Sequence, residues 1–242
     1  MPSLSVFIAC KNHGKYLKEA VYSCLNQTLP PNEVILIKDG SRDNSLEVMY
    51  SIQAKEKPGT IKVINHKVGQ GHIASYNEGI RESGSEVIHL MAADDALIDP
   101  GFYEEANDHF ESDDNVGFVV GGLQWMDSRG KLLATKAIPP LRGVCKARDI
   151  LFALSRYGNF ICGGGTLVRK SVQMKAGPYL SELPYSADFA NWINVLRQNV
   201  RGVFLQRATY GYRRHTEQMT TQSSAPLGER ETCANLLHEA LK

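Results

Sequence analysis

The sequence predicts an α/β fold: a doubly wound, mostly parallel sheet with helices on both faces. Short apolar strands alternate with amphipathic helices through the first half of the chain, as in consecutive βαβ units with right-handed crossovers. Polar or glycine-containing turns also follow each of these strands. Because ligands of such sheets bind outside the carboxyl ends of the strands, those turns form the candidate site.

The elements of the first half are defined by apolar periodicity. Short, β-rich apolar runs predict strands, and apolar residues spaced three and four apart predict helices. In chain order we expect strand Ser5–Cys10, helix 16–26, strand Val34–Ile37, helix 45–55, strand Ile61–Ile64, helix Ile73–Glu82 and strand Val87–Met91.

The pattern changes after Pro100, where a hairpin and shorter strands are expected. These elements are helix Phe102–Phe110, strand Val116–Val120 extended by Leu123–Met126, strand Lys131–Ala137, helix Lys146–Tyr157, a strand-like stretch Phe160–Val168 interrupted by Gly163–Gly165, helix Ala187–Arg197, short strands Val203–Leu205 and Thr209–Tyr212, a mobile polar loop Thr216–Gly228, and helix Ala234–Leu241. No repeat or linker is visible. We therefore expect one domain, 1–242, with a nucleotide-binding half, 1–100, and an acceptor-binding half, 101–242.

Composition excludes several classes of protein. The 242 residues are 43% hydrophobic and 22% charged, with a formal net charge of +1, which argues against disorder and against nucleic acid as the main partner. The five cysteines are odd in number and lack zinc-site spacing. We see no signal peptide and no apolar run long enough to span a bilayer. A cytoplasmic location is expected, with peripheral attachment to the inner face of the membrane left open.

The acidic pair Asp94 and Asp95 follows the fourth strand. Neighbouring carboxylates repel each other unless a cation or a proton lies between them. An alternative role is to cap the next helix, but Asp99–Pro100 already provides an N-cap and a first helical residue. The pair therefore predicts a divalent metal and phosphate site.

Three further polar groups follow the first three strands: Lys11/Asn12, Asp39 and Gly69–Gly71. Asp39 can accept hydrogen bonds from a base or ribose, and the N–H groups of the glycine loop can approach a phosphate or sugar. The alternative for Asp39 is turn and cap formation, since its neighbours are turn formers. The GxxxxGK[ST] loop, the full dinucleotide fingerprint and the GxSxG elbow are all absent.

These motifs together resemble the N-terminal signature of inverting family-2 glycosyltransferases of the GT-A fold. The stretch SVFIACKNHGKYLKEAVYSCLNQTLPPNEVILIKDGSRDNS carries most of the resemblance, which is close over residues 3–110 and looser to about 216. The matching positions are Asn12, Tyr16-Leu17, Ser23, Gln27-Thr28, Asp39-Gly40-Ser41, Asp43, Asn65–Gly69, Ala74, Asn77 and Gly79.

The resemblance implies a nucleotide-sugar donor, for which a UDP-sugar is expected. Asp39 would bind the nucleoside, with Ala9 and Asn12 nearby and Gly69 in the adjoining loop. Asp94 would contact the donor ribose or sugar as well as a metal ion. No single motif is specific to the family, but the set is.

The metal site implied by the resemblance holds Mn²⁺ or Mg²⁺ on the diphosphate. Asp94 and Asp95 would be its ligands, and His215, in a Tyr-Arg-x-His-like segment, would join them. Arg213 or Arg214 would offset the diphosphate charge.

The resemblance assigns general-base catalysis to Asp188, which begins a segment similar to the family's Glu-Asp-x-x-x-W/L-x-x-x-x-R. Asp188 would take the proton of the acceptor hydroxyl as its oxygen attacks the anomeric carbon. The alternative is a carboxylate that stabilises a helix N-terminus. Gly163–Gly165 and Asn159 would line the acceptor side, or the glycines would belong to the core.

Three departures from the family pattern affect these roles. Ala9-Cys10-Lys11-Asn12 replaces Pro-Thr-Tyr-Asn, Lys38 replaces the first Asp of Asp-Asp-Gly, and Ala92 replaces the first Asp of the metal motif. Weak metal binding or metal independence is therefore one expectation.

The function that follows is inverting transfer of a sugar to a glycan, lipid-linked or protein acceptor, in the context of bacterial surface polysaccharide synthesis. The alternative is a non-catalytic member of the fold that binds a nucleotide or glycan. A nucleotidyltransferase ranks last, because its glycine-rich N-terminal loop is missing.

Overall fold

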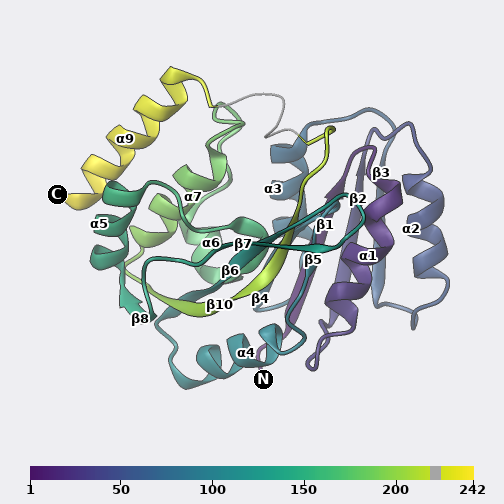
Figure 1. Ribbon diagram of the computed structural model, residues 1–242, viewed down its shortest axis with the longest axis horizontal. Helices are drawn as coiled ribbons and strands as arrows, with labels where there is room; N and C mark the ends of the chain where they lie inside the picture. The colour runs from purple at the N-terminus through teal and green to yellow at the C-terminus, as the bar shows by residue number, and fades with distance from the viewer. Residues whose placement is uncertain (219–224) are drawn as a thin grey trace.

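The computed structural model describes residues 1–218 and 225–242, and all ten of its strands join one sheet (Figure 1). The main path of the sheet runs β3-β2-β1-β4-β9-β6-β10-β5, while β7 pairs with β6 and β8 pairs with β10. The strands are β1 Leu4–Cys10, β2 Glu33–Asp39, β3 Ile61–His66, β4 Val87–Ala92, β5 Ala96–Leu97, β6 Val116–Met126, β7 Leu132–Ala137, β8 Gly143–Lys146, β9 Thr166–Arg169 and β10 Arg201–Arg213.

Helices cover both faces of the sheet, and their buried residues separate into two large hydrophobic clusters. α1, α2 and α4 pack on one face, and α3, α5, α6, α7 and α9 contribute to the other. The helices are α1 Gly14–Leu25, α2 Ser45–Gln53, α3 His72–Glu82, α4 Phe102–Ser112, α5 Ala147–Tyr157, the 3₁₀ turn η1 Gly163–Gly165, α6 Lys170–Ala176, α7 Ala187–Leu196 and α9 Leu227–Leu241.

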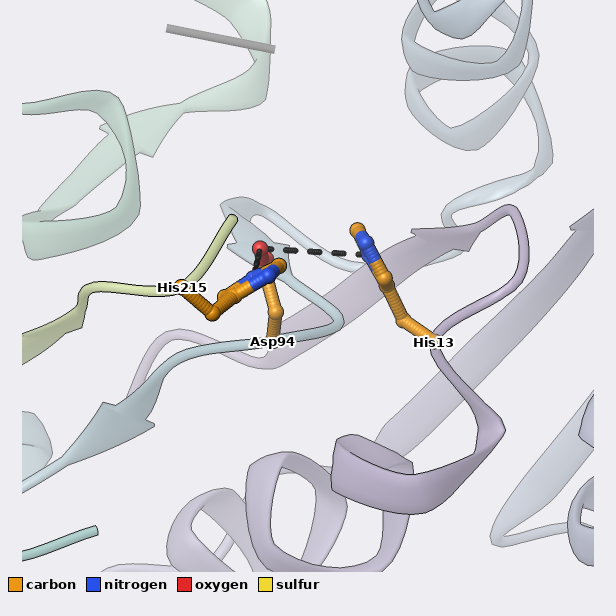
Figure 2. Close-up of side chains that lie close together, drawn as sticks. All are labelled: His13, Asp94 and His215. Carbon is orange, nitrogen blue, oxygen red and sulfur yellow. Dashed lines mark hydrogen bonds and ion pairs between the residues drawn. The ribbon is translucent and has the colours of Figure 1, made fainter. Parts of the chain in front are cut away.

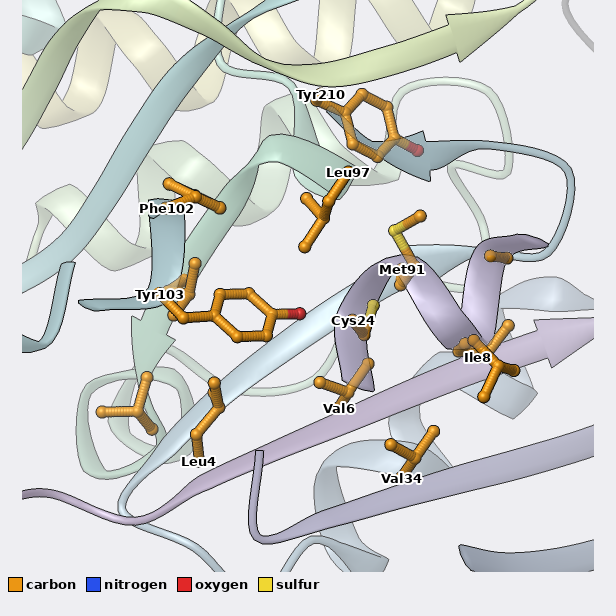
Figure 3. Close-up of a cluster of buried hydrophobic side chains, with 14 of the residues drawn as sticks. Leu4, Val6, Ile8, Cys24, Val34, Met91, Leu97, Phe102, Tyr103 and Tyr210 are labelled. Carbon is orange, nitrogen blue, oxygen red and sulfur yellow. The ribbon is translucent and has the colours of Figure 1, made fainter. Parts of the chain in front are cut away.

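The strands of the first half are apolar on both sides because helices cover both sides. Along β1, Val6 and Ile8 enter the first cluster, with Cys24 of α1 (Figure 3), and Phe7 enters the second. This alternation follows from the two-residue period of a strand. The pairings β3–β2, β2–β1 and β1–β4 are all parallel, as expected from the βαβ pattern. Each predicted element of this half is present, with ends that differ by a few residues.

The second half makes the sheet mixed. β6 and β10 are parallel, whereas β9 runs antiparallel to both β4 and β6 and joins the two halves. The predicted hairpin is confirmed, since β7 pairs antiparallel with β6. The two short strands expected in residues 203–212 form one strand, β10, whose pairing with β6 shifts register.

Several boundaries differ from the sequence prediction for local reasons. The stretch 160–168 was predicted as strand-like, but its three glycines form the η1 turn and only its last residues enter β9. α4 starts at Phe102, so Asp99 is not its N-cap; the Asp99 carboxylate instead accepts the N–H of Gly101. The last helix starts at Leu227, within the polar loop predicted for 216–228. The central part of that loop lies outside the described residues.

Membrane-spanning elements are absent from the part of the chain that the structure describes, where no helix combines the length and apolarity of a bilayer crossing.

Candidate functional site

The loops that follow β1 and β2 are joined by the polar side chains of the first sequence motif. The backbone N–H of Asn12 donates to Ser41 Oγ at 3.0 Å, and Asn12 Oδ1 accepts the N–H of Arg42 at 2.8 Å. Asn12 has a φ of 60°, a conformation that asparagine tolerates better than most residues. Asn12 is thus exposed at the sheet edge and fixes the two loops to each other.

Asp39 ends β2 and holds the glycine loop that follows β3. Its carboxylate accepts the N–H groups of Gln70 and Gly71, the second at 3.0 Å, and the residue is only 3% exposed. The loops also touch directly, since a Cβ on Gly40 would lie 2.3 Å from the nitrogen of Gly69. Two of the amides predicted to face a phosphate or sugar therefore bind Asp39, while Gly69 itself stays exposed.

Asp94 lies at the carboxyl end of β4 beside two histidines (Figure 2). Its Oδ2 is 2.9 Å from Nε2 of His215 and 3.9 Å from Nδ1 of His13. His13 immediately precedes α1, and His215 follows β10, so the sheet brings together three distant segments. The predicted pair Asp94 and His215 is thus in contact, and His13 completes a cluster that the sequence did not suggest.

Asp95 points away from this cluster, although it was predicted to bind the same metal. One of its oxygens accepts the hydroxyl of Tyr210, and the other accepts the backbone N–H of Arg213 at 2.7 Å. Burial, together with repulsion from Asp94, raises the pKa of Asp95. Asp95 therefore fixes β10 to the end of β4, and it is absent from the group of potential ligands within the described residues.

Arg213 is also buried, so its predicted contact with a diphosphate does not match its position. Its guanidinium donates to the backbone oxygen of Asp94 at 2.6 Å and to Glu19 of α1 at 2.6 Å, and it lies over the ring of Tyr16. The neighbouring Arg214 is exposed. Of the two arginines that the sequence offered for a diphosphate, Arg214 is the one with an accessible side chain.

Ala9 and Ala92 face each other across β1 and β4, at the end of each strand. Both are partly exposed. Because Ala92 stands where the family motif has a carboxylate, the sheet edge beside Asp94 carries two small side chains, Ala9 and Ala92.

Asp188 is the second residue of α7, and its half-buried carboxylate has two hydrogen-bond partners. Asn159 donates its side-chain amide at 2.9 Å, and the N–H of Phe189 donates at 2.8 Å. Burial raises the pKa of Asp188, and these two hydrogen bonds oppose the shift. Asp188, predicted as the base, and Asn159, predicted to line the acceptor side, are therefore in contact.

Tyr76 of α3 is affected by the charges of both acidic regions. Burial raises its pKa, and the charges of Asp94 and Asp188 both add to the shift. Its ring packs edge-on against Tyr179, with the ring centroids 5.8 Å apart. Nothing in the sequence motif singled out this residue, although its position on the third helix is near the glycine loop.

The η1 turn is supported from below by a buried histidine. His89 of β4 lies 2.8 Å from the backbone oxygen of Gly164 and 2.7 Å from the hydroxyl of Tyr103. Gly164 itself rests on the ring of Tyr210, where a Cβ would lie 2.2 Å from ring atoms. The glycine is therefore needed for close packing above the tyrosine that binds Asp95.

The donor set of the cluster fits a divalent metal ion. One carboxylate oxygen and two imidazole nitrogens from His13, Asp94 and His215 lie within 4.8 Å of one another. Imidazole and carboxylate are both common metal ligands in proteins.

The family model for glycosyl transferase family 2 matches residues 5–175, and the chain belongs to this family. The first half, with the Asp39 loop and the Asp94 edge, lies inside the matched region, while Asp188 and His215 lie beyond it.

Curated relatives agree with this family. An uncharacterized glycosyltransferase of Nostoc is 29% identical over 72% of this chain and 53% of its own length. The poly-β-1,6-N-acetyl-D-glucosamine synthase of Staphylococcus epidermidis is 25% identical over 72% of this chain and 41% of its own length. The chain thus spans about half the length of these relatives.

Solved structures show that the fold is of the GT-A type. The crystal structure of S. aureus TarS 1–349 in complex with UDP-GlcNAc matches with a TM-score of 0.77 at 15% identity, covering 98% of this chain and 66% of TarS. The complex of the same TarS fragment with UDP matches with a TM-score of 0.73.

Proposed function

We propose that the protein transfers a sugar, with inversion, from a nucleotide-diphosphate-sugar to a hydroxyl acceptor. The observation that carries the proposal is that groups from both halves of the chain meet at the end of β4, where His13, Asp94 and His215 lie together. The first half supplies the Asp39 loop and, within the metal-ligand cluster, His13 and Asp94; the second half supplies His215 and the half-buried Asp188. Besides burial, the charges of Asp94 and Asp188 both raise the pKa of Tyr76, which supports a short distance between the two groups.

The donor half, 1–100, would hold the nucleotide. Asp39 keeps the glycine loop in position, and the exposed surfaces of Ala9, Asn12 and Gly69 border the space next to it. Lys11 adds a positive charge there, since its Nζ would lie 3.4 Å from a Cβ on Gly69. TarS was solved with UDP and UDP-GlcNAc, which supports a UDP-sugar as the donor of this chain.

The departing diphosphate needs positive charge around it. A divalent ion held by Asp94 and His215 would neutralise part of that charge. The exposed Arg214, which follows the buried Arg213, would pair with phosphate oxygens. The role of Asp95 would be indirect: it fixes the backbone of Arg213 and so the position of this basic segment.

Asp188 would act as the general base. Its carboxylate would accept the proton of the acceptor hydroxyl while the oxygen attacks the anomeric carbon opposite the leaving diphosphate. Burial raises its pKa and so strengthens it as a base. Asn159 orients one carboxylate oxygen, and Gly163–Gly165 would line the acceptor side of the second half, 101–242.

Surface polysaccharide synthesis is the context that the relatives support. One of them is a poly-N-acetylglucosamine synthase, and a glycan or lipid-linked acceptor would suit that context. The chain spans about half of these relatives, and we propose its acceptor by analogy with them.

Sugar transfer can be tested with purified protein, Mn²⁺, a panel of UDP-sugars and oligosaccharide acceptors. We expect sugar transfer or slow donor hydrolysis in the wild type and neither in Asp188→Asn. Equal behaviour of the two proteins would exclude Asp188 as the base.

A binding protein of the same fold is the second candidate, favoured by Ala92 at a position where the family carries a carboxylate. Calorimetric binding of UDP without turnover over the whole panel would support it.

A further inference from the structure

We propose that His13, Asp94 and His215 form a metal site of two histidines and one carboxylate, which binds divalent transition-metal ions in preference to Mg²⁺. The inference deepens the proposed function, because this site is where the donor diphosphate would bind. It assigns to His13 the role of a metal ligand. It also assigns a class of ion to the site. The sequence suggested Mn²⁺ and Mg²⁺ equally and did not distinguish between them.

The three side chains already approach the geometry of a coordination site. His215 Nε2 and His13 Nδ1 lie 2.9 and 3.9 Å from the same oxygen, Oδ2 of Asp94. Two ligands that bind one ion at about 2.1 Å each lie no more than about 4.2 Å apart. The observed separations are of this size. Small rotations of the side chains would be enough to bring all three atoms around one ion.

The surroundings make the site protected but open to a ligand. The side chains of His215, Asp94 and His13 are 4%, 14% and 20% exposed. The imidazole rings of His13 and His215 meet edge-on, and Tyr16 packs against His215. Rings held in this way lose little conformational entropy on binding. The remaining exposure leaves coordination positions for oxygen atoms of a bound ligand.

Oxygen ligands are scarce in this site because two carboxylates are missing from it. Ala92 has no carboxylate to offer, and both oxygens of Asp95 are engaged by Tyr210 and Arg213. His13 fills the position of a third ligand instead. Mg²⁺ prefers an octahedral shell of oxygens, whereas imidazole nitrogen suits Zn²⁺, Co²⁺, Ni²⁺ and Fe²⁺, and mixed nitrogen and oxygen sets also hold Mn²⁺. The donor set therefore disfavours Mg²⁺.

His215 would have to change tautomer to bind a metal ion through Nε2. Nδ1 of His215 accepts the N–H of Glu217 at 3.2 Å, so the ring proton lies on Nε2 and points to Asp94. A neutral ring that held an ion through Nε2 would release this proton to solvent, would take one up on Nδ1, and would give up the bond from Glu217.

The test measures binding of the metal alone to the full chain. Metal-free protein is titrated by calorimetry with Mn²⁺, Co²⁺ and Mg²⁺, and the Co²⁺ complex is followed by its visible d–d absorption, whose position and intensity depend on the ligands and their geometry. We expect Mn²⁺ and Co²⁺ to bind at least about 10-fold more tightly than Mg²⁺, because two of the three ligand atoms are imidazole nitrogens and Mg²⁺ prefers an all-oxygen shell.

Variants identify the ligand. His13→Ala is expected to weaken Co²⁺ binding at least about 10-fold and to alter the spectrum, leaving Mg²⁺ affinity unchanged. His13→Asp is expected to shift the preference toward Mg²⁺, since it adds a carboxylate. His238→Ala, which removes an exposed histidine of α9, is the matched control and should bind like the wild type.

The proposal is overturned if Mg²⁺ binds as tightly as Co²⁺, if no ion binds, or if both His13 variants, folded by circular dichroism, bind Co²⁺ like the wild type. UDP binding and sugar transfer are measured separately. Sugar transfer without metal binding would contradict this inference but support the proposed function. Metal binding without UDP binding or turnover would support this inference but contradict the proposed function.

Discussion

The side-chain amide of Asn159 donates a 2.9 Å hydrogen bond to the carboxylate of Asp188 at the start of α7. This contact links the loop before the η1 turn to the proposed base. Burial favours the neutral form of Asp188, while the hydrogen bonds from Asn159 and from the N–H of Phe189 favour the charged form. A carboxylate in this balance can be a stronger base than an exposed aspartate and still be ionised when the enzyme works.

Asp188→Asn should abolish most of the transfer rate without unfolding the protein. The amide keeps the size of the side chain but cannot accept the proton of the acceptor, and general-base catalysis contributes about 10²- to 10⁴-fold. Initial rates of transfer and UDP affinity by calorimetry check this. A rate within a few-fold of wild type would assign Asp188 to helix stabilisation instead.

Asn159→Ala should move the acid side of the pH–rate profile to higher pH. The substitution removes a hydrogen bond to the charged form of Asp188, so the pKa rises further above its ordinary value. At any pH on the acid side, a smaller fraction of the base is then ionised and kcat/KM falls. Asn159→Asp, which places a second carboxylate there, should shift the profile in the same direction. An unchanged profile would separate Asn159 from the base.

Asp39→Asn should weaken UDP binding by about 10- to 100-fold. The carboxylate accepts the N–H groups of both Gln70 and Gly71, but an amide presents one oxygen and an N–H₂ group that repels the second donor. The glycine loop would then lose its position beside the nucleotide. Ser51→Ala, a change on α2 outside these loops, is the control. Calorimetry with UDP gives the affinities, and equal values would show that the loop does not depend on Asp39.

Local pattern was enough to predict the first half of the fold. Each strand there is a short apolar run that must be buried on both faces, and each helix has one apolar side, so the sequence alone predicts the order and the parallel direction. The site follows from the same rule, because Asp39 and Asp94 both end such strands.

Long-range contacts explain what the sequence could not provide. His13 looked like one residue of a polar turn, but the parallel pairing of β1 with β4 brings it to Asp94, where His215 arrives from the end of β10. Asp95 and Arg213 were assigned to the ligand site, but residue type does not show which of two adjacent carboxylates faces inward. Burial of Asp95 under Tyr210 decides that. Gly163–Gly165 interrupted an apparent strand, and the turn they form depends on His89 beneath it.

His89 should make the protein less stable as the pH falls from 7 toward 4. The ring is fully buried, and burial lowers its pKa from 6.5 to about 4. As the pH falls, His89 is therefore protonated near pH 6.5 in the unfolded chain but only near pH 4 in the folded chain. The contribution of His89 to the free energy of unfolding is fully present above pH 6.5. It is lost as the pH falls from 6.5 to 4, by about 3 kcal/mol in total.

Urea unfolding at several pH values measures this loss. Asp95 and Asp188 have raised pKa values, so their contributions change in the opposite direction as the pH falls. The comparison is therefore between the wild type and His89→Gln, which lacks the titrating ring. The difference in free energy of unfolding should shrink on acidification. A constant difference from pH 7 to 4.5 would contradict a neutral, buried His89.

Gly40→Ala should destabilise the protein more than Gly59→Ala, although both glycines have positive φ. Gly40 has a φ of 67° and Gly59 a φ of 90°, so alanine is strained at each by about 1–2 kcal/mol. A Cβ on Gly40 would also lie 2.3 Å from the backbone of Gly69, while one on Gly59 would meet only open space. The collision should add about 1–3 kcal/mol. Because it separates the Asp39 and Gly69 loops, Gly40→Ala should also reduce UDP affinity, and Gly59→Ala should not. Urea unfolding and calorimetry of the pair decide this, and matching losses in the two variants would mean that the contact between the loops contributes nothing beyond backbone strain.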